Sequence, residues 1–315
     1  MRTQKGEKNM KKGMKIAGIT VLVLLLGLGV YGFTVYRSLS NMMNEVHYEV
    51  DTDDLRDGDF ALGQTDEDGN IKPFSVLLLG IDADGPNDQG RSDSMMLVTV
   101  NPNEGSTNIL SIQRDTRVEI VGRGFYDKIN HAYAFGGAQM SINTVQNWLD
   151  VPVDYFVEIR EDGFEIMIDA MGGVTVDNTT LAFSMDGYHF PLGTQSLDGS
   201  QALAFTRMRK QDPQGDFGRM TRQRITLEAM ARRGLQVGAT RFGPIMDAVG
   251  ENMRTDFTLG DLVTLATNYT AALNQVEMMD LRGQGTTING IWYLLVSDQE
   301  RQEMTHLLRS HLELD

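Results

Sequence analysis

The stretch FSVLLLGID, residues 74–82, is a short apolar run that ends in a glycine and an acidic residue. Such a run is typical of a strand that is buried on both faces of a sheet. SMMLVTV (94–100) and TNILSIQRD (107–115) predict two further strands, joined by the turn NPNEGS, and VDYFVEI (153–159) predicts another. The strands therefore point to a sheet with FSVLLLGID in its interior.

Helices are predicted between and after these strands. In EDGFEIMIDAMGG (161–173), Phe164, Met167, Ile168 and Met171 fall on one helical face, which we interpret as core. Asp198, with Gln201 three places on, forms a capping-box pattern for a short helix. Further helices are predicted over 138–149, 220–233, 258–273 and 298–312. A further strand is predicted over 290–296. We expect a single α/β domain from about 73 to 315.

The amino terminus predicts a membrane anchor. Six cations among residues 1–15 precede IAGITVLVLLLGLGVYGFTVY, residues 16–36, which carries no charge. At about 1.5 Å per residue this helix would span roughly 30 Å, the hydrocarbon thickness of a bilayer. Basic residues stay in the cytoplasm, so residues beyond 36 are expected outside the cell, with 37–72 as an acidic stalk.

Charge and composition exclude several classes of protein. The chain has 28 cations against 43 acids and no cysteine, so a disulfide framework and a thiolate site are excluded. After residue 15 there remain 22 cations and 42 acids, and only Lys72, Lys128 and Lys210 are lysine. A nucleic-acid binder would have a basic external domain. No G-x-S-x-G or H-E-x-x-H pattern occurs, which argues against serine-triad and zinc chemistry.

Cations nevertheless gather in FTRMRKQDPQGDFGRMTRQR, residues 205–224. Arg207 and Arg209 lie two apart on a segment that we expect to be extended, so they share a face. The i, i+3, i+4 spacing of Arg219, Arg222 and Gln223 places them on one helical face. Arg224 is off that face and is predicted at the surface. For Lys210, the sequence is compatible both with the surface and with the site.

Other charged residues mark the ends of predicted strands, where ligands gather in α/β sheets. Asp82 follows the first strand, Arg91 and Asp93 precede the second, and Arg114 and Asp115 follow the third. A diphosphate held by arginines and bridged by a hard cation on one or two carboxylates satisfies this set. The alternative is that the arginines make ordinary surface ion pairs with Asp212 and Asp216.

The motifs carry a resemblance to a known family. LLLGIDADGPNDQGRSDSMMLVTVNP, SIQRDTRVEI, GFYDKINHAYAFGG, MGGVTV, LDGSQALAFTRMRK and GDFGRMTRQR occur in this order over about residues 73–235. Together they resemble the LytR-CpsA-Psr family of cell-wall glycopolymer ligases. The resemblance implies a three-layer α/β/α fold with a central mixed sheet and a deep pocket for a polyprenyl chain. It implies transfer of a phosphorylated glycopolymer, such as teichoic acid or capsule, from a polyprenyl diphosphate to peptidoglycan.

The resemblance also implies site residues. Asp82 and Asp93 match the magnesium-associated aspartates, with Mn²⁺ as a possible substitute. The diphosphate-binding or catalytic set matches Arg91, Arg114, Lys128, Arg207, Arg209, Arg219, Arg222 and Gln223. The sequence departs from the family pattern at Asp84, Gln113 and Arg224, where arginine, proline and glutamine are usual.

A mechanism follows from these assignments. A sugar hydroxyl of peptidoglycan would attack the glycan-proximal phosphorus, and polyprenyl phosphate would leave while arginines and magnesium neutralise its charge. Asp115 or Asp93 is the expected proton acceptor. Two alternatives need the same residues in part: a polyprenyl-diphosphate diphosphatase that uses water, and a non-catalytic regulator that only binds the lipid.

Overall fold

The computed structural model describes residues 46–50, 55–56, 60–83, 89–237, 244–245 and 247–314. Their centre is a six-stranded sheet. The strands lie in the order β11 (Met253–Thr255), β6 (Tyr155–Arg160), β1 (Phe74–Asp82), β2 (Arg91–Asn101), β3 (Ser106–Ser111) and β12 (Gln275–Asp280). The β1–β6 and β3–β12 pairs are parallel and the other pairs are antiparallel, so the sheet is mixed.

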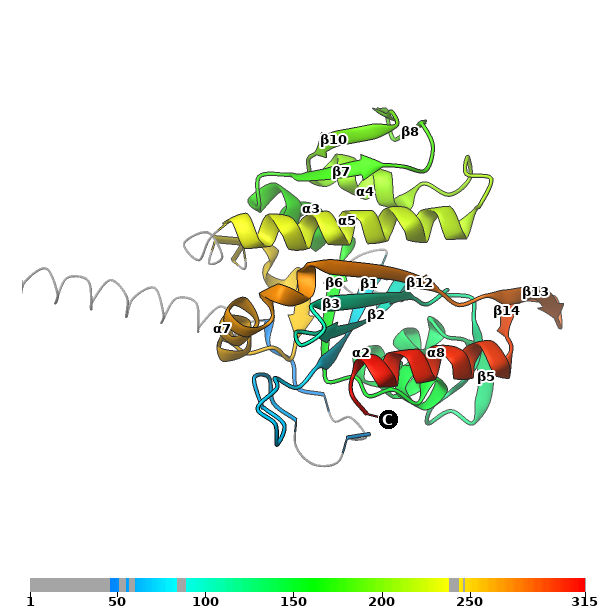
Figure 1. The fold of residues 1–315 in the computed structure, drawn as a ribbon. Coiled ribbons are helices and arrows are strands. Elements are labelled where there is room, and N and C mark those ends of the chain that lie inside the picture. The colour runs from blue at the N-terminus through cyan, green and yellow to red at the C-terminus, as the bar shows by residue number, and fades with distance from the viewer. Residues whose placement is uncertain are drawn as a thin grey trace, which may run out of the picture.

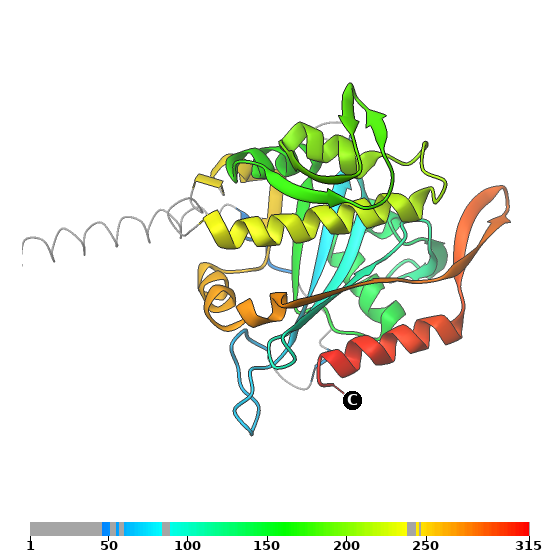
Figure 2. The same cartoon turned by 45° about the horizontal axis from the view of Figure 1, so that its top comes forward.

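Helices cover both faces of this sheet (Figure 1). One face carries α2 (His131–Leu149) and α8 (Asp298–His311). The other carries α3 (Glu161–Ala170), α4 (Gly199–Arg207) and α5 (Asp216–Val237), and α5 crosses over the strands (Figure 2). The mixed α/β class with a central mixed sheet is thus confirmed.

The remaining elements surround this body. Four two-stranded sheets pair β4 (Arg117–Ile120) with β5 (Phe125–Lys128), β7 (Val174–Asn178) with β10 (Gly193–Leu197), β8 (Phe183–Met185) with β9 (Tyr188–Phe190), and β13 (Gly283–Ile288) with β14 (Ile291–Val296). Further helical elements are η1 (Gly250–Asn252), α7 (Leu259–Asn268) and η2 (Thr270–Leu273), where η denotes a 3-10 helix.

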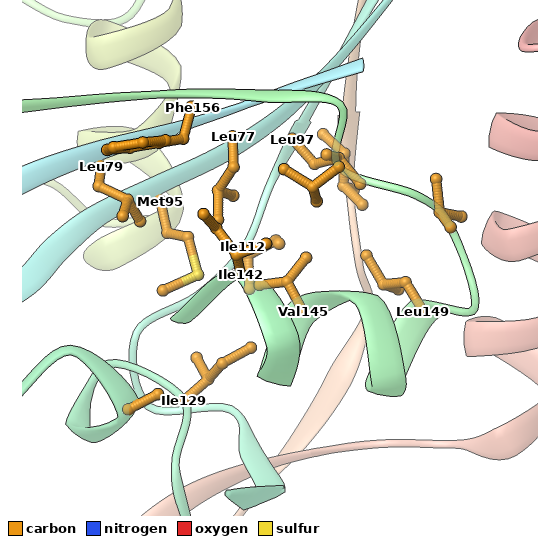
Figure 3. Close-up of a cluster of buried hydrophobic side chains, with 14 of the residues drawn as sticks. Leu77, Leu79, Met95, Leu97, Ile112, Ile129, Ile142, Val145, Leu149 and Phe156 are labelled. Carbon is orange, nitrogen blue, oxygen red and sulfur yellow. The ribbon is translucent and has the colours of Figure 1, made fainter. Parts of the chain in front are cut away.

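Strand β1 is buried on both faces, as its apolar run predicts. Leu77, Leu79 and Ile81 pack against the α2 side of the sheet, in the cluster that Figure 3 shows. Phe74 and Val76 belong to a second cluster on the opposite side. The alternation follows from the two-residue period of a strand, which sends successive side chains to opposite faces.

Most predicted elements are present, with instructive differences. The helix expected to begin at 138 starts at His131 but is kinked at Gly136 and Gly137, where Gly137 has φ 66°. The capping box of Asp198 and Gln201 is confirmed. The predictions miss the edge strands β11 and β12 and the strands β4, β5, β7, β8, β9, β10 and β13 of the small sheets, all of which are short and contain exposed positions. Their sequences therefore lack the continuous apolar run that marks a strand buried on both faces.

The amino-terminal predictions fall mainly outside the described residues. The expected anchor, 16–36, and the basic tail lie there entirely. Within the described ranges, no helix combines the length and apolarity needed to cross a bilayer. Residues 60–72, assigned to the stalk, pack against the domain: the Tyr269 hydroxyl accepts from the Gly63 amide at 3.2 Å and donates to the Lys72 carbonyl at 2.9 Å.

Candidate functional site

A cavity of about 730 Å³ lies between the sheet and the helices α3, α4 and α5. Its lining changes character along two elements that run beside it. Along β1 the lining passes from Leu78 to Asp82, and along α5 it passes from Met230 and Leu227 to Gln223 and Arg219. One end of the cavity is therefore apolar and the other is polar and charged.

The apolar end is built from the strands β1, β2 and β6 and the helices α3, α4 and α5. Its lining consists of apolar side chains: Leu78, Met96, Val157, Ile159, Phe164, Met167, Leu203, Leu227 and Met230. Phe164 and Met167 were predicted as core. They do pack against the cluster of α3, α4 and β7, and they also line the cavity.

A bulge in the β1–β2 ladder brings two carboxylates to the charged end. The register pairs Gly80 with Ser94 but Ile81 with Ser92, so Asp93 is the extra residue. The strands approach closely there, since a Cβ on Gly80 would lie 2.9 Å from the Ser94 Cβ. Asp82 and Asp93 consequently line the same cavity.

Arg114 connects Asp93 to a third acidic residue, Asp115. Its guanidinium pairs with Asp93 through Nη1, and its Nε lies 3.7 Å from Asp115 Oδ2. Lys128 Nζ lies 2.5 Å from Asp115 Oδ1, and Asn130 Nδ2 donates to Asp93 Oδ1 at 3.2 Å. The segment after β3 and the end of β5 thus form one ion-pair network with the bulge.

Arg207 and Arg209 occupy the opposite wall. Arg207 ends α4, and its Nη1 lies 3.5 Å from Glu161 Oε2 at the start of α3. Arg209 Nη1 lies 3.9 Å from Asp216 Oδ1. The segment is not the extended run that we expected, because Arg207 belongs to α4; Met208, which follows it, has extended backbone angles. Both side chains are nevertheless about half exposed and line the cavity.

Among the described arginines that line the cavity, Arg219 is the one with a buried Nε that lacks a partner; Arg222 and Arg224 share this feature but lie outside the cavity. The Nη2 of Arg219 lies 2.9 Å from Asp216 Oδ1, but its Nε is buried without a hydrogen-bond partner in the described part of the chain. Burial lowers the pKa of Arg219, Asp216 opposes that change, and the nearby Arg114 adds to it. A bound anion would relieve both the burial cost and the repulsion between the cations.

Glu161 faces the two aspartates. Burial raises the pKa of its carboxyl, Arg207 opposes the rise, and Asp82 and Asp93 add to it. Three negative groups thus share this part of the cavity. A cation held by Asp82 and Asp93 would lower the repulsion among the three groups.

A second, polar pocket of about 500 Å³ adjoins the first. The two share Asp82, Asp93 and Arg114. Its other lining side chains include Arg91, Asp115, Lys128, Asn130 and His131. The ion-pair network therefore separates an amphipathic cavity from a polar one.

The structure brings most of the predicted site residues into these two pockets. The first is lined by Asp82, Asp93, Arg114, Arg207, Arg209, Arg219 and Gln223, and the second by Arg91, Asp115 and Lys128. Gln223 Oε1 accepts from the Ser94 hydroxyl at 3.2 Å. Lys210, left open by the sequence, also lines the first pocket.

Arg222 does not share the exposed face predicted for it. Its side chain is fully buried, its Nη1 lies 2.7 Å from Asp212 Oδ2, and it lines neither pocket. Its Nη2 donates to the Met208 carbonyl, and Phe183 covers the guanidinium with its ring centroid 5.3 Å away. The alternative, an ion pair with Asp212, is the observed contact for this arginine, but the pair is buried and not at the surface as that alternative had it.

The surface position predicted for Arg224 is wrong. Arg224 is 4% exposed, and its Nη1 lies 2.8 Å from Asp280 Oδ1 and 3.0 Å from the Met279 carbonyl of β12. The error has a physical cause. Because α5 lies between the sheet and the layer of α4 and β7, more than one of its faces is covered.

The carboxylates suit a magnesium ion that keeps part of its water. Among the described residues, no group of three or more carboxylate or imidazole side chains could enclose a metal. Asp82 and Asp93 at one cavity end supply two, and Mg²⁺ usually combines one or two carboxylates with substrate oxygens and water. The pair therefore fits a metal that binds together with a phosphate substrate.

Glu161, Asn130 and His131 are among the pocket residues that the sequence did not single out. Asn130 and His131 stand inside the motif GFYDKINHAYAFGG, and the i, i+4 spacing of Asp127 and His131 was a usable signal. Glu161 had no such signal, since its pairing with Arg207 depends on how α3 and α4 pack.

Comparison with known proteins identifies relatives over nearly the whole chain. A polyisoprenyl-teichoic acid–peptidoglycan teichoic acid transferase TagU from Halalkalibacterium halodurans is 46% identical over 311 residues, covering 97% of this chain and 100% of the relative. The protein of the same name from Bacillus subtilis is 40% identical over 316 residues, covering 99% and 100%.

Solved structures agree with the fold. The crystal structure of B. subtilis TagU superposes with a TM-score of 0.64 at 40% identity, covering 76% of this chain and 97% of the other. TagT bound to LI-WTA superposes with a TM-score of 0.68 at 34% identity, covering 82% and 95%. The family model of the LytR_cpsA_psr family matches residues 33–310. With its fold, its motifs and these relatives in agreement, the chain belongs to the LytR_cpsA_psr family.

Proposed function

We propose that this protein transfers a teichoic acid from a polyprenyl diphosphate carrier to peptidoglycan and releases polyprenyl phosphate. The observation that carries the proposal is the cavity that is apolar at one end and lined by Arg114, Arg207, Arg209 and Arg219 at the other. A polyprenyl diphosphate has the same division into a hydrocarbon chain and a dianionic head. The relatives named for teichoic acid transfer cover nearly the whole chain.

The arginines would hold the diphosphate oxygens in this arrangement. Guanidinium groups bind phosphate oxygens through paired hydrogen bonds, and the buried, unpartnered Nε of Arg219 supplies one donor. Transfer of a phosphoryl group requires mostly positioning and electrostatic stabilisation. Cations fixed before the substrate arrives therefore stabilise the charge that develops on the leaving polyprenyl phosphate.

We further propose that Asp82 and Asp93 hold Mg²⁺ together with the diphosphate. When bound, the ion would neutralise phosphate oxygens between the two carboxylates. The polar pocket across the ion-pair network would then receive the acceptor glycan. We also propose that the helix expected over 16–36 anchors the chain, with its basic amino terminus in the cytoplasm and its catalytic domain outside the cell.

A reconstituted transfer assay tests the function. The protein is incubated with a synthetic polyprenyl diphosphate that carries a teichoic acid fragment, with and without peptidoglycan, and both products are measured. We expect attachment to peptidoglycan and release of polyprenyl phosphate. Release of free glycopolymer phosphate at an equal rate without peptidoglycan would indicate a diphosphatase instead. Binding without turnover would indicate a regulator.

Metal dependence is tested in the same assay. We expect chelation by EDTA to lower the transfer rate and Mg²⁺ or Mn²⁺ to restore it. Asp82→Asn and Asp93→Asn should each weaken the restoration, because only one carboxylate would remain. Equal rates in EDTA for the native protein and both variants would contradict the metal role.

A further inference from the structure

A histidine and an aspartate face each other at the edge of the polar pocket. His131, the first residue of α2, lines this pocket, and its Nδ1 lies 2.8 Å from Asp127 Oδ2. Asp127 belongs to β5, and its Oδ1 accepts from the Tyr293 hydroxyl of β14 at 3.3 Å. Asp127 thus holds the imidazole from behind while being held itself by a neighbouring hairpin.

The contacts of Asp127 determine which ring nitrogen of His131 carries the proton. Burial acts to raise the pKa of Asp127, but hydrogen bonds from His131, the Lys128 amide and Tyr293 outweigh it and lower that pKa. The carboxyl is therefore ionised and only accepts hydrogen bonds. His131 must donate through Nδ1, so in the neutral ring Nε2 keeps its lone pair.

Nε2 is free to meet a substrate. Across the described residues no hydrogen bond to this nitrogen is present, and the side chain is 24% exposed in the pocket. The pocket contains Asp82, Asp93 and Arg114, which also line the amphipathic cavity. An acceptor in the polar pocket would thus stand between the imidazole and a diphosphate in the cavity.

The two aspartates expected to accept the proton are less available. Asp93 is bonded to Arg114 through one oxygen and to Asn130 through the other. Asp115 contacts Lys128 through one oxygen and Arg114 through the other. An acceptor hydroxyl would have to compete with these donors at either carboxylate. It would meet no such competitor at His131 Nε2.

We propose that His131 is the general base of the transfer and that Asp127 is its positioning residue. This inference rests on the proposed function. The acceptor hydroxyl oxygen forms a bond to the glycan-proximal phosphorus as its proton passes to Nε2. The bond from that phosphorus to the bridging oxygen breaks, and polyprenyl phosphate leaves with the electron pair. The imidazolium, stabilised by Asp127, then returns its proton to solvent.

The test measures transfer to peptidoglycan for His131→Ala, Asp127→Asn and the control His306→Ala, whose histidine is exposed on α8. We expect His131→Ala to lower kcat by a hundredfold or more, the usual contribution of a positioned base. KM for the lipid donor and the melting temperature should change little. Added imidazole should restore part of the rate, and His306→Ala should behave as the native protein.

The pH profile separates a base from a structural residue. A general base acts only in its unprotonated form, so the native pH–rate profile should have an acidic limb that His131→Ala loses. The groups that face this imidazole are Asp82, Arg91, Asp93, Arg114, Asp115 and Lys128 across the pocket and Asp127, with Tyr293, behind it. Asp127→Asn should lower kcat as well, because its amide favours the wrong tautomer.

Two results overturn the inference while leaving the proposed function intact. One is a His131→Ala protein that transfers at the native rate. The other is a slow His131→Ala protein with an unchanged acidic limb and no rescue by imidazole. Failure of the native protein to transfer at all would instead contradict the proposed function.

Discussion

Arg219 and Arg222 lie on the same helix, α5, but differ in their access to the cavity. Both have a buried Nε without a hydrogen-bond partner in the described part of the chain, and both pair with an aspartate. Arg219 nevertheless lines the cavity, whereas Arg222 is fully buried and lines neither pocket. Spacing alone places both on one side of α5, since positions i and i+3 are neighbours. Their burial could not be predicted, because it depends on Met208 and Phe183, which arrive from other elements.

This difference predicts different phenotypes. Arg219→Ala should slow transfer by roughly tenfold to over a hundredfold, since a charge-assisted hydrogen bond contributes about 1.5–3 kcal/mol. Its folding stability should change little. Arg222→Ala should lower the free energy of unfolding by about 3–5 kcal/mol, because Asp212 would remain buried without a partner. Urea unfolding and transfer rates of both variants check this. Matching losses of stability would contradict it.

Asp256 predicts a pH-dependent stability that is independent of catalysis. Burial raises its pKa to about 7, while its Oδ1 accepts from the Phe156 amide at 2.8 Å. The folded protein thus holds this proton more tightly than the unfolded chain does. Its contribution to stability therefore falls as the pH rises from about 4 to 7.

Asp256→Asn should remove that loss, since an amide oxygen can still accept the Phe156 bond. We expect the variant to be more stable than the native protein at pH 8 by more than about 1 kcal/mol, as each pKa unit corresponds to about 1.4 kcal/mol. The two should match near pH 4. Denaturant titrations at both pH values measure this, with the exposed Glu67→Gln as control. A variant less stable at pH 8 would refute the assignment.

At the scale of elements, the packing of α3 against α4 sets the arginine wall. Gly199 begins α4, its amide donates to Asp169 Oδ1 at 2.7 Å, and a Cβ there would lie 2.2 Å from the Glu165 carbonyl oxygen. The close contact positions Arg207 at the far end of α4 beside Glu161 of α3. The capping box of α4 was predictable from sequence, but this approach was not.

Gly199→Ala should therefore disturb both stability and the site. We expect a loss of about 1–3 kcal/mol in the free energy of unfolding, typical of overpacking, and a slower transfer as Arg207 shifts. Gly234→Ala in α5 is the matched control, because a Cβ there meets no atom within 4 Å. It should be neutral or slightly stabilising, since alanine favours helix. Calorimetry and the transfer assay compare them, and equal behaviour would disprove the packing argument.

The elements that were predictable share a strong local signal. The apolar run of β1 and the helical face of Phe164, Met167, Ile168 and Met171 carry periodicity that survives folding. β12 has partly exposed residues and pairs only with β3, 164 residues or more distant in sequence. Its formation depends on a long-range contact, which no local pattern records.

For the whole molecule, the central feature is a cavity whose two ends differ in chemistry. The sheet supplies one wall and α3, α4 and α5 supply the other, so the apolar end lies within the layers and the charged end lies where β1 and α4 terminate. The strand-end aspartates and the arginines could be predicted from sequence. The resemblance implied a deep pocket, but the residues that line its apolar end could not be identified, since they follow the ordinary pattern of a core.

The proposed function requires that the polyprenyl chain occupies the apolar end while the diphosphate meets the arginines. Photo-crosslinking tests it most directly, with a polyprenyl diphosphate that carries a photoreactive group in its hydrocarbon chain. Mass spectrometry then locates the labelled peptides. We expect label on α3 and α5 near Met167, Leu227 and Met230, and loss of label when unlabelled polyprenyl diphosphate competes. Label confined to other surfaces, or unaffected by the competitor, would contradict the account.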